Sequence, residues 1–130
     1  MFRFVRLMAA FRRRHGVLRR KLFFAGGSDI SWHGERQGQP DWSEDVRWLA
    51  FLLDGGHASD DHLFVMMNAS EDWRHFEVPH RGREWRRVVD TSKDAPEDVY
   101  EDESRAPSVG YQSPRYAVEP RSLVVLVMPR

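Results

Sequence analysis

Two kinds of hydrophobic spacing divide the chain. Near the start, apolar residues and one histidine recur at steps of three and four positions: Phe4, Leu7, Met8, Phe11, His15, Leu18 and Leu22. Such spacing places these side chains on one stripe of an α-helix. We expect a helix over about residues 2–15, because Gly16 favours a helix end, and a second short turn toward Leu22. The predicted docking face of this helix is Phe4, Leu7, Met8 and Phe11.

After Gly26-Gly27 the spacing changes to the alternation and short apolar runs of β-strands. The expected strands cover residues 29–33, 47–54, 62–69, 74–78, 84–90 and 122–128, with further strand-like residues around Ser113-Pro114. Residues 47–54 and 62–69 read as an antiparallel hairpin, and the apolar run 122–128 as a central strand. The acidic, proline-containing stretch 91–109 reads as a loop.

These elements predict a mainly β protein, in which an N-terminal α-helix precedes an antiparallel β-sandwich of about seven or eight strands. The boundary is placed between residues 1–27, a basic amphipathic helix and linker, and residues 28–130, the sandwich. A length of 130 residues fits one domain with an appendage. Five Trp and eight Phe can supply a hydrophobic core.

Charge is distributed unevenly, although the formal net charge is zero. Residues 1–28 carry eight Arg and Lys and no acid. The remaining residues carry twelve Arg and Lys against all twenty Asp and Glu, which gives net −8. A basic N-terminal segment followed by an acidic remainder indicates one of two arrangements. The segment either binds a partner or docks on the rest of the same molecule.

The sequence contains few signs of catalytic or metal chemistry. The absence of Cys excludes disulfides and Cys-based zinc sites and fits a reducing compartment. The six His show no metal-ligand spacing, so we expect solvated loop histidines and no metal or cofactor. Asp60-Asp61 and Glu101-Asp102-Glu103 lie in loop-like stretches and are expected to be hydrated surface. No nucleophile elbow or phosphate-binding loop occurs, and no apolar run approaches the roughly 20 residues of a membrane span.

The five Trp are candidates for a carbohydrate-binding surface, because aromatic faces pack against the apolar faces of sugars. Trp32, Trp48 and Trp85 lie within strand-like alternation, where core positions are expected. Trp42 and Trp73 lie beside turns, so they are the predicted surface residues and the candidate glucan contacts.

The basic helix allows three interpretations. Its arginines could contact nucleic-acid phosphates. It could be a transit peptide, although such segments are Ser-rich and this one is not. It could also be a structural helix whose apolar stripe packs on a neighbour while its arginines reach solvent or acidic residues. Charge and hydrophobic spacing alone barely distinguish a nucleic-acid-binding helix from a structural helix.

The ordered blocks of the chain resemble a known family. The stretch FVRLMAAFRRRHGVLRR resembles the last barrel helix of isoamylase-type glycogen debranching enzymes, in the α-amylase superfamily. The blocks FFAGG, DISWHG, Asp41-Trp42, RWLAFLLDG, FVMMNAS, FEVP, WRRVVDTS and YAVEPRSLVVLV then follow that family's C-terminal region in order. The resemblance covers nearly the whole chain. It departs at Gly16, where the family usually has Pro, and at residues 70–73, where His and aromatic residues are more frequent.

The resemblance implies a C-terminal β-sandwich that follows a catalytic (β/α)₈ barrel. The catalytic carboxylates of that family lie on the barrel, so no catalytic residue is expected here and the isolated chain should not hydrolyse glucan. The parent activity would be hydrolysis of α-1,6 branch linkages in glycogen, with a cytoplasmic location. The implied partners are a glycosidase barrel domain or a second copy, reached through the helix, and a weakly bound glucan. A free-standing protein-interaction module is the alternative, and a nucleic-acid-binding domain ranks third.

Overall fold

The computed structural model describes residues 2–19, 29–58, 60–79, 83–109 and 115–129. One helix, α1 (Phe2–Arg14), comes first and is followed by the short 3-10 helix η1 (Gly16–Arg19). The strands are β1 (Ile30–His33), β2 (Trp48–Leu53), β3 (His62–Asn68), β4 (Arg74–Glu77), β5 (Trp85–Asp90), β6 (Ser108–Val109), β7 (Arg115–Val118) and β8 (Ser122–Met128). Two further 3-10 helices are η2 (Gly55–Ala58) and η3 (Glu103–Arg105).

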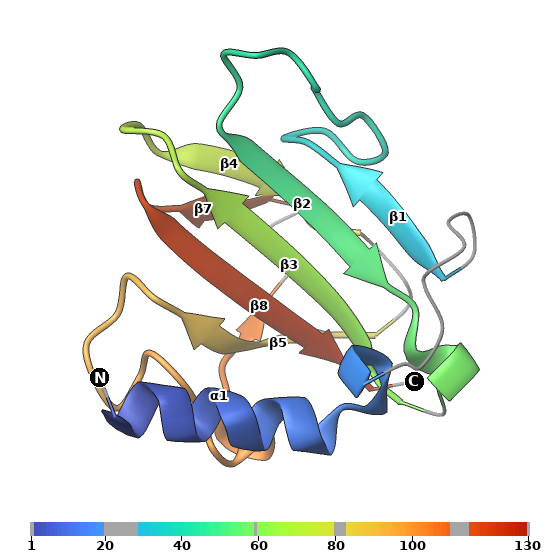
Figure 1. The fold of residues 1–130 in the computed structure, drawn as a ribbon, viewed down its shortest axis with the longest axis vertical. Coiled ribbons are helices and arrows are strands. Elements are labelled where there is room, and N and C mark those ends of the chain that lie inside the picture. Colours follow the sequence, from blue (N-terminus) through green and yellow to red (C-terminus); the bar gives the residue numbers. More distant parts are fainter. Residues whose placement is uncertain (1, 20–28, 59, 80–82, 110–114, 130) are drawn as a thin grey trace.

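The strands form two antiparallel sheets (Figure 1). The larger has six strands in the order β1-β2-β3-β8-β5-β6, and the smaller pairs β4 with β7. The β2–β3 hairpin is antiparallel, and β8 lies between β3 and β5. The mainly β fold with an N-terminal helix and an antiparallel sandwich is therefore confirmed.

Each face of the six-stranded sheet has its own hydrophobic cluster, because side chains alternate along a strand. On the face toward β4 and β7, Phe64 and Leu126 pack with Phe76, Val118 and other apolar residues. The Nε1 of the buried Trp85 donates to the backbone oxygen of Pro79 at 2.7 Å, so burial leaves the indole satisfied. This cluster forms the interior of the sandwich.

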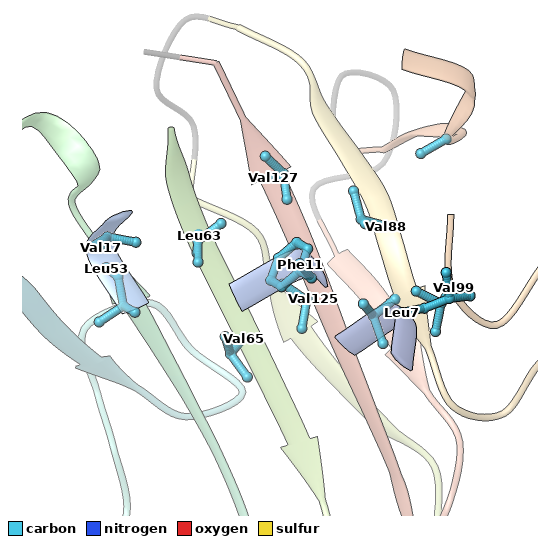
Figure 2. Packing of buried hydrophobic residues seen from close by; sticks show 12 residues of the cluster. Leu7, Phe11, Val17, Leu53, Leu63, Val65, Val88, Val99, Val125 and Val127 are labelled. Atoms are coloured by element: carbon cyan, nitrogen blue, oxygen red, sulfur yellow. The ribbon is translucent and has the colours of Figure 1, made fainter. Parts of the chain in front are cut away.

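Helix α1 covers the opposite face of the same sheet (Figure 1). Its side chains Leu7 and Phe11 are buried in a cluster with the sheet residues Leu53, Leu63, Val65, Val88, Val89, Val125 and Val127. Figure 2 shows Phe11 over Val125 and Leu7 beside Val99. The stripe at steps of three and four residues is therefore the side of the helix that joins the sheet.

Several details differ from the sequence-based expectation. The acidic stretch 91–109 is not entirely loop, because it contains η3 and the short strand β6. Trp32 lies in β1 but is 41% exposed, so it is not a core residue. Strand β1 lies at the edge of the sheet, away from α1. The alternating pattern separates the two faces of a strand, but it cannot show that one face has no element packed against it. The predicted second short turn after the helix is present as η1 (Gly16–Arg19). Its continuation to Leu22, the predicted boundary at residues 27 and 28 and the turn at Ser113-Pro114 lie outside the described residues.

We expect Phe11→Ala to lower the free energy of unfolding by about 3–5 kcal/mol, because Phe11 is 2% exposed and fills the space between α1 and the sheet. Urea unfolding monitored by circular dichroism would measure this loss. Val5→Ala, on the exposed side of the same helix, should change stability by less than about 0.5 kcal/mol. Equal effects of the two substitutions would contradict this packing.

Candidate functional site

A hollow of about 460 Å³ lies where β2 begins and β3 ends. It is lined by Asp41, Trp42, Ser43, Val46, Arg47, Trp48, Leu49, Met67 and Ala69. The lining combines an apolar floor with a few charged and hydroxyl groups, a composition typical of small-ligand sites. We call it the Trp42 groove.

Trp42 is the most exposed aromatic residue of this groove, with 66% of its surface accessible. Its ring meets the Trp32 ring at 5.7 Å between centroids and an angle of 68°, and Trp32 in turn contacts Phe51 at 5.6 Å. Edge-to-face contacts of this kind stabilise aromatic pairs. Trp42 is therefore held in place by the sheet while most of its surface stays accessible.

The rim of the groove carries a fixed negative charge. Both the hydroxyl and the backbone N–H of Ser43 donate to Oδ1 of Asp41, at 2.6 and 3.0 Å. These hydrogen bonds lower the pKa of Asp41, so the carboxylate is ionised at neutral pH. The Arg74 guanidinium lies 3.6 Å from the centre of the ring of Trp48, one of the lining residues, and this cation–π contact covers one side of that indole.

Trp73, the second candidate glucan contact, lies elsewhere. It immediately precedes β4 and is 53% exposed. It does not line the Trp42 groove. The structure therefore separates the two tryptophans, and it does not test contact with glucan at either.

The residues of the predicted docking face lie against this chain's own sheet. Leu7 and Phe11 are buried, while Phe4 and Met8 are partly buried against the same cluster. The opposite side of α1 exposes Phe2 and Val5, at 82% and 57%. Docking of another protein through the helix stays a prediction, and this outward side is the surface left for it.

An ionic cluster forms where α1 ends. His15 is buried and lies between two carboxylates that are distant in sequence. Its Nδ1 is 3.0 Å from Oδ1 of Asp60, and its Nε2 is 2.8 Å from Oε2 of Glu103. The backbone N–H of Val17 also donates to Asp60, at 3.2 Å, and Arg14 donates twice to Glu103, at 2.8 and 3.0 Å. The cluster ties the end of the helix to two loops of the sandwich.

The hydrogen-bond partners determine the charge of His15, because a carboxylate can only accept from each ring nitrogen. Burial lowers the pKa of His15, but the hydrogen bonds and charges of Glu103 and Asp60 outweigh burial and raise the pKa above 6.5. Burial raises the pKa of Glu103, yet the hydrogen bonds from His15 and Arg14 lower it below 4.5. The cluster thus favours the protonated form of His15 and the ionised form of Glu103.

This arrangement corrects two expectations from the sequence. His15 and His33 are buried rather than solvated, and Asp60 and Glu103 are not simply hydrated surface. His15, Asp61 and Glu103 offer possible ligand atoms within 4.8 Å of one another. However, both nitrogens of the imidazolium donate to carboxylates, so a metal ion would have to displace a proton and these bonds. We therefore interpret the cluster as a structural ion network.

Sequence reasoning missed this cluster because its members come from positions 15, 60 and 103. One signal was present. His15 lies four positions after Phe11 on the apolar stripe, and the two rings are 4.5 Å apart. A buried residue that carries a charge needs an opposite charge beside it, so a histidine on the apolar stripe of a basic helix pointed to an acidic partner.

The chain is similar to a known family and to several characterised proteins. Residues 31–125 match the model of the family described as "Isoamylase 1-3, C-terminal". Isoamylase SU1, chloroplastic, of Zea mays is 36% identical over 103 residues, which cover 78% of this chain and 13% of that protein. Isoamylase 3, chloroplastic, of Oryza sativa subsp. japonica is 28% identical over 128 residues, which cover 96% of this chain and 15% of the relative.

A solved structure shares the fold. The crystal structure of the GBS pullulanase SAP in complex with maltotetraose aligns with a TM-score of 0.51 at 18% identity, over 78% of this chain and 13% of that one. This chain thus spans about 13% of the length of the maize relative and of the pullulanase. Among the described residues, no helix is long and apolar enough to cross a membrane.

The His15 cluster predicts a loss of stability at alkaline pH. A histidine whose pKa is raised by folding contributes its full stabilisation below pH 6.5 and loses it as the pH rises through the raised value. The thermal midpoint of the wild type should therefore fall as the pH rises above about 6.5 and through the raised pKa of His15. His15→Gln should be less stable at pH 6 and should lack this decline. Parallel curves for the two proteins, from calorimetry in matched buffers, would contradict the assignment.

Proposed function

Because this chain belongs to the family of isoamylase C-terminal domains, we propose that it acts as the non-catalytic C-terminal domain of a glycogen debranching hydrolase. In this proposal the parent enzyme cleaves α-1,6 branch linkages, and this domain stabilises its catalytic barrel. The main support for the proposal is that α1 has apolar residues on two opposite sides. One side is buried against the sandwich, and the other exposes its apolar residues.

The chemistry of the described carboxylates supports a non-catalytic role. Glycoside hydrolysis needs one carboxyl group whose pKa is raised so that it can act as a general acid. Three of the described carboxyl groups, those of Asp41, Asp102 and Glu103, have a lowered pKa, which is the opposite of what a general acid needs. Asp60 and Glu103 face each other across His15, where hydrogen bonds occupy both.

The outward side of α1 is the proposed contact with the barrel. Phe2 and Val5 are more than half exposed on a helix that the sheet holds in place. Exposed apolar groups that adjoin one another commonly mark an interface. The relatives carry this segment within much longer chains, so a catalytic domain in the same polypeptide is the proposed occupant of this surface.

A free-standing module that binds another protein or a second copy through the same surface is the alternative function. Nucleic-acid binding ranks below it, because two basic residues of α1 already serve the fold: Arg3 pairs with Asp98 at 2.9 Å and Arg14 pairs with Glu103. Binding to DNA that weakens steeply with added salt would favour nucleic acid. A cytoplasmic location stays a prediction, since the relatives named above are described as chloroplastic.

Association with a catalytic barrel is testable by coexpression. We expect the chain to co-elute with the catalytic region of an isoamylase that lacks its own C-terminal domain. Val5→Glu should weaken this association at least about tenfold, because it places a charge in an apolar contact. Trp73→Ala, an equally exposed site outside the helix, should have no effect.

The same preparations test catalysis. The chain alone should release no reducing ends from glycogen, whereas the coexpressed pair should. Hydrolysis by the chain alone would contradict the non-catalytic assignment. Absence of co-elution, or co-elution unaffected by Val5→Glu, would contradict the proposed contact and favour an independent module.

A further inference from the structure

We propose that the Trp42 groove binds a single α-1,4-linked glucan chain, with Trp42 as the surface on which a glucose ring stacks. This inference rests on the proposed function, which supplies the substrate class, and adds a specific site away from catalysis. Figure 1 shows the connection between β1 and β2, which carries Trp42, at the end of the sheet opposite α1. A glucan in this groove would therefore leave the outward side of the helix free for the barrel.

The first argument is the preorganisation of the stacking surface. Trp42 is two-thirds exposed, yet its ring is braced by Trp32, which is itself supported by Phe51. A large aromatic side chain that is fixed in place loses little conformational freedom when a ligand packs on it. A ligand that stacks on such a ring needs neither a nucleobase nor a charge. It needs only an apolar face, such as the C–H groups of a pyranose ring.

The second argument is the chemistry around that surface. The ionised Asp41 carboxylate, oriented by Ser43, and the exposed Arg47 guanidinium both border the groove. A carboxylate accepts hydrogen bonds from sugar hydroxyls, and a guanidinium donates to them. The apolar floor of Leu49 and Met67 would face the rings. An apolar platform beside a few charged groups matches an uncharged polyhydroxylated ligand better than a nucleic acid or a lipid.

The linkage follows from the proposed function, because the unbranched stretches of glycogen are α-1,4-linked. Trp32 braces Trp42 and does not line the groove, so the indole of Trp42 is the surface offered for stacking.

Trp73 provides a matched control. It is also an exposed tryptophan, at 53%, but it lies outside the groove. If exposed indole alone were sufficient for glucan contact, the two residues would contribute similarly. If the groove is required, only Trp42 contributes.

The experiment is isothermal titration of the whole chain with maltoheptaose, with cellohexaose as the β-linked comparison. We expect the wild type to bind maltoheptaose and not cellohexaose. Trp42→Ala should weaken binding about tenfold or more, and Trp73→Ala less than about twofold. Asp41→Asn should give a smaller loss than Trp42→Ala. Unfolding curves of the variants should overlay that of the wild type, which separates lost binding from lost folding.

Three results would overturn the inference: absence of maltoheptaose binding by the wild type, equal binding of cellohexaose, or equal losses from Trp42→Ala and Trp73→Ala. None of them would affect co-elution with a catalytic region, which depends on Val5 and the outward side of α1. Failure of the groove is therefore distinguishable from failure of the proposed domain function.

Discussion

The packing of Leu7 and Phe11 on the six-stranded sheet is the contact on which the rest of the arrangement depends. The face that they cover includes Leu63, Val65 and Val125, and without the helix these side chains would be exposed to water. Burial of a side chain the size of Leu or Phe contributes about 1.5–3 kcal/mol. The helix is therefore an outer layer of the sandwich. Because its buried side is fixed on the sheet, its outward side is held in a position where another domain or protein can contact it.

Electrostatics fixes the position of the same helix. The basic N-terminal segment and the acidic remainder suggested either binding to a partner or docking within the molecule, and the described ion pairs follow the second pattern. Arg3 reaches Asp98 near the start of α1, and Arg14 and His15 reach Glu103 at its end. The pair through His15 is buried, so salt screens it less than the exposed pairs.

The sequence predicted the elements well because each depends on local spacing. The stripe of Phe4, Leu7 and Phe11 predicted the helix, and the apolar run 122–128 predicted a central strand. Local spacing cannot show which strand ends lack a covering layer, so Trp32 was expected in the core. It also cannot bring together His15, Asp60 and Glu103, whose contact requires the complete fold. The exposure of Trp42 could be anticipated from the adjacent turn, but its support by Trp32 and Phe51 could not.

The most direct test of the central claim is hydrogen exchange of the backbone amides of α1 in the isolated chain. If Leu7 and Phe11 anchor the helix to the sheet, amides in the second half of α1 should be protected to nearly the same degree as those of β3 and β8, because they open only on global unfolding. Phe11→Ala should lower that protection selectively in the helix. Exchange of α1 at the rate of an unfolded peptide, with the sheet still protected, would show that the helix is not part of this fold and would contradict the account.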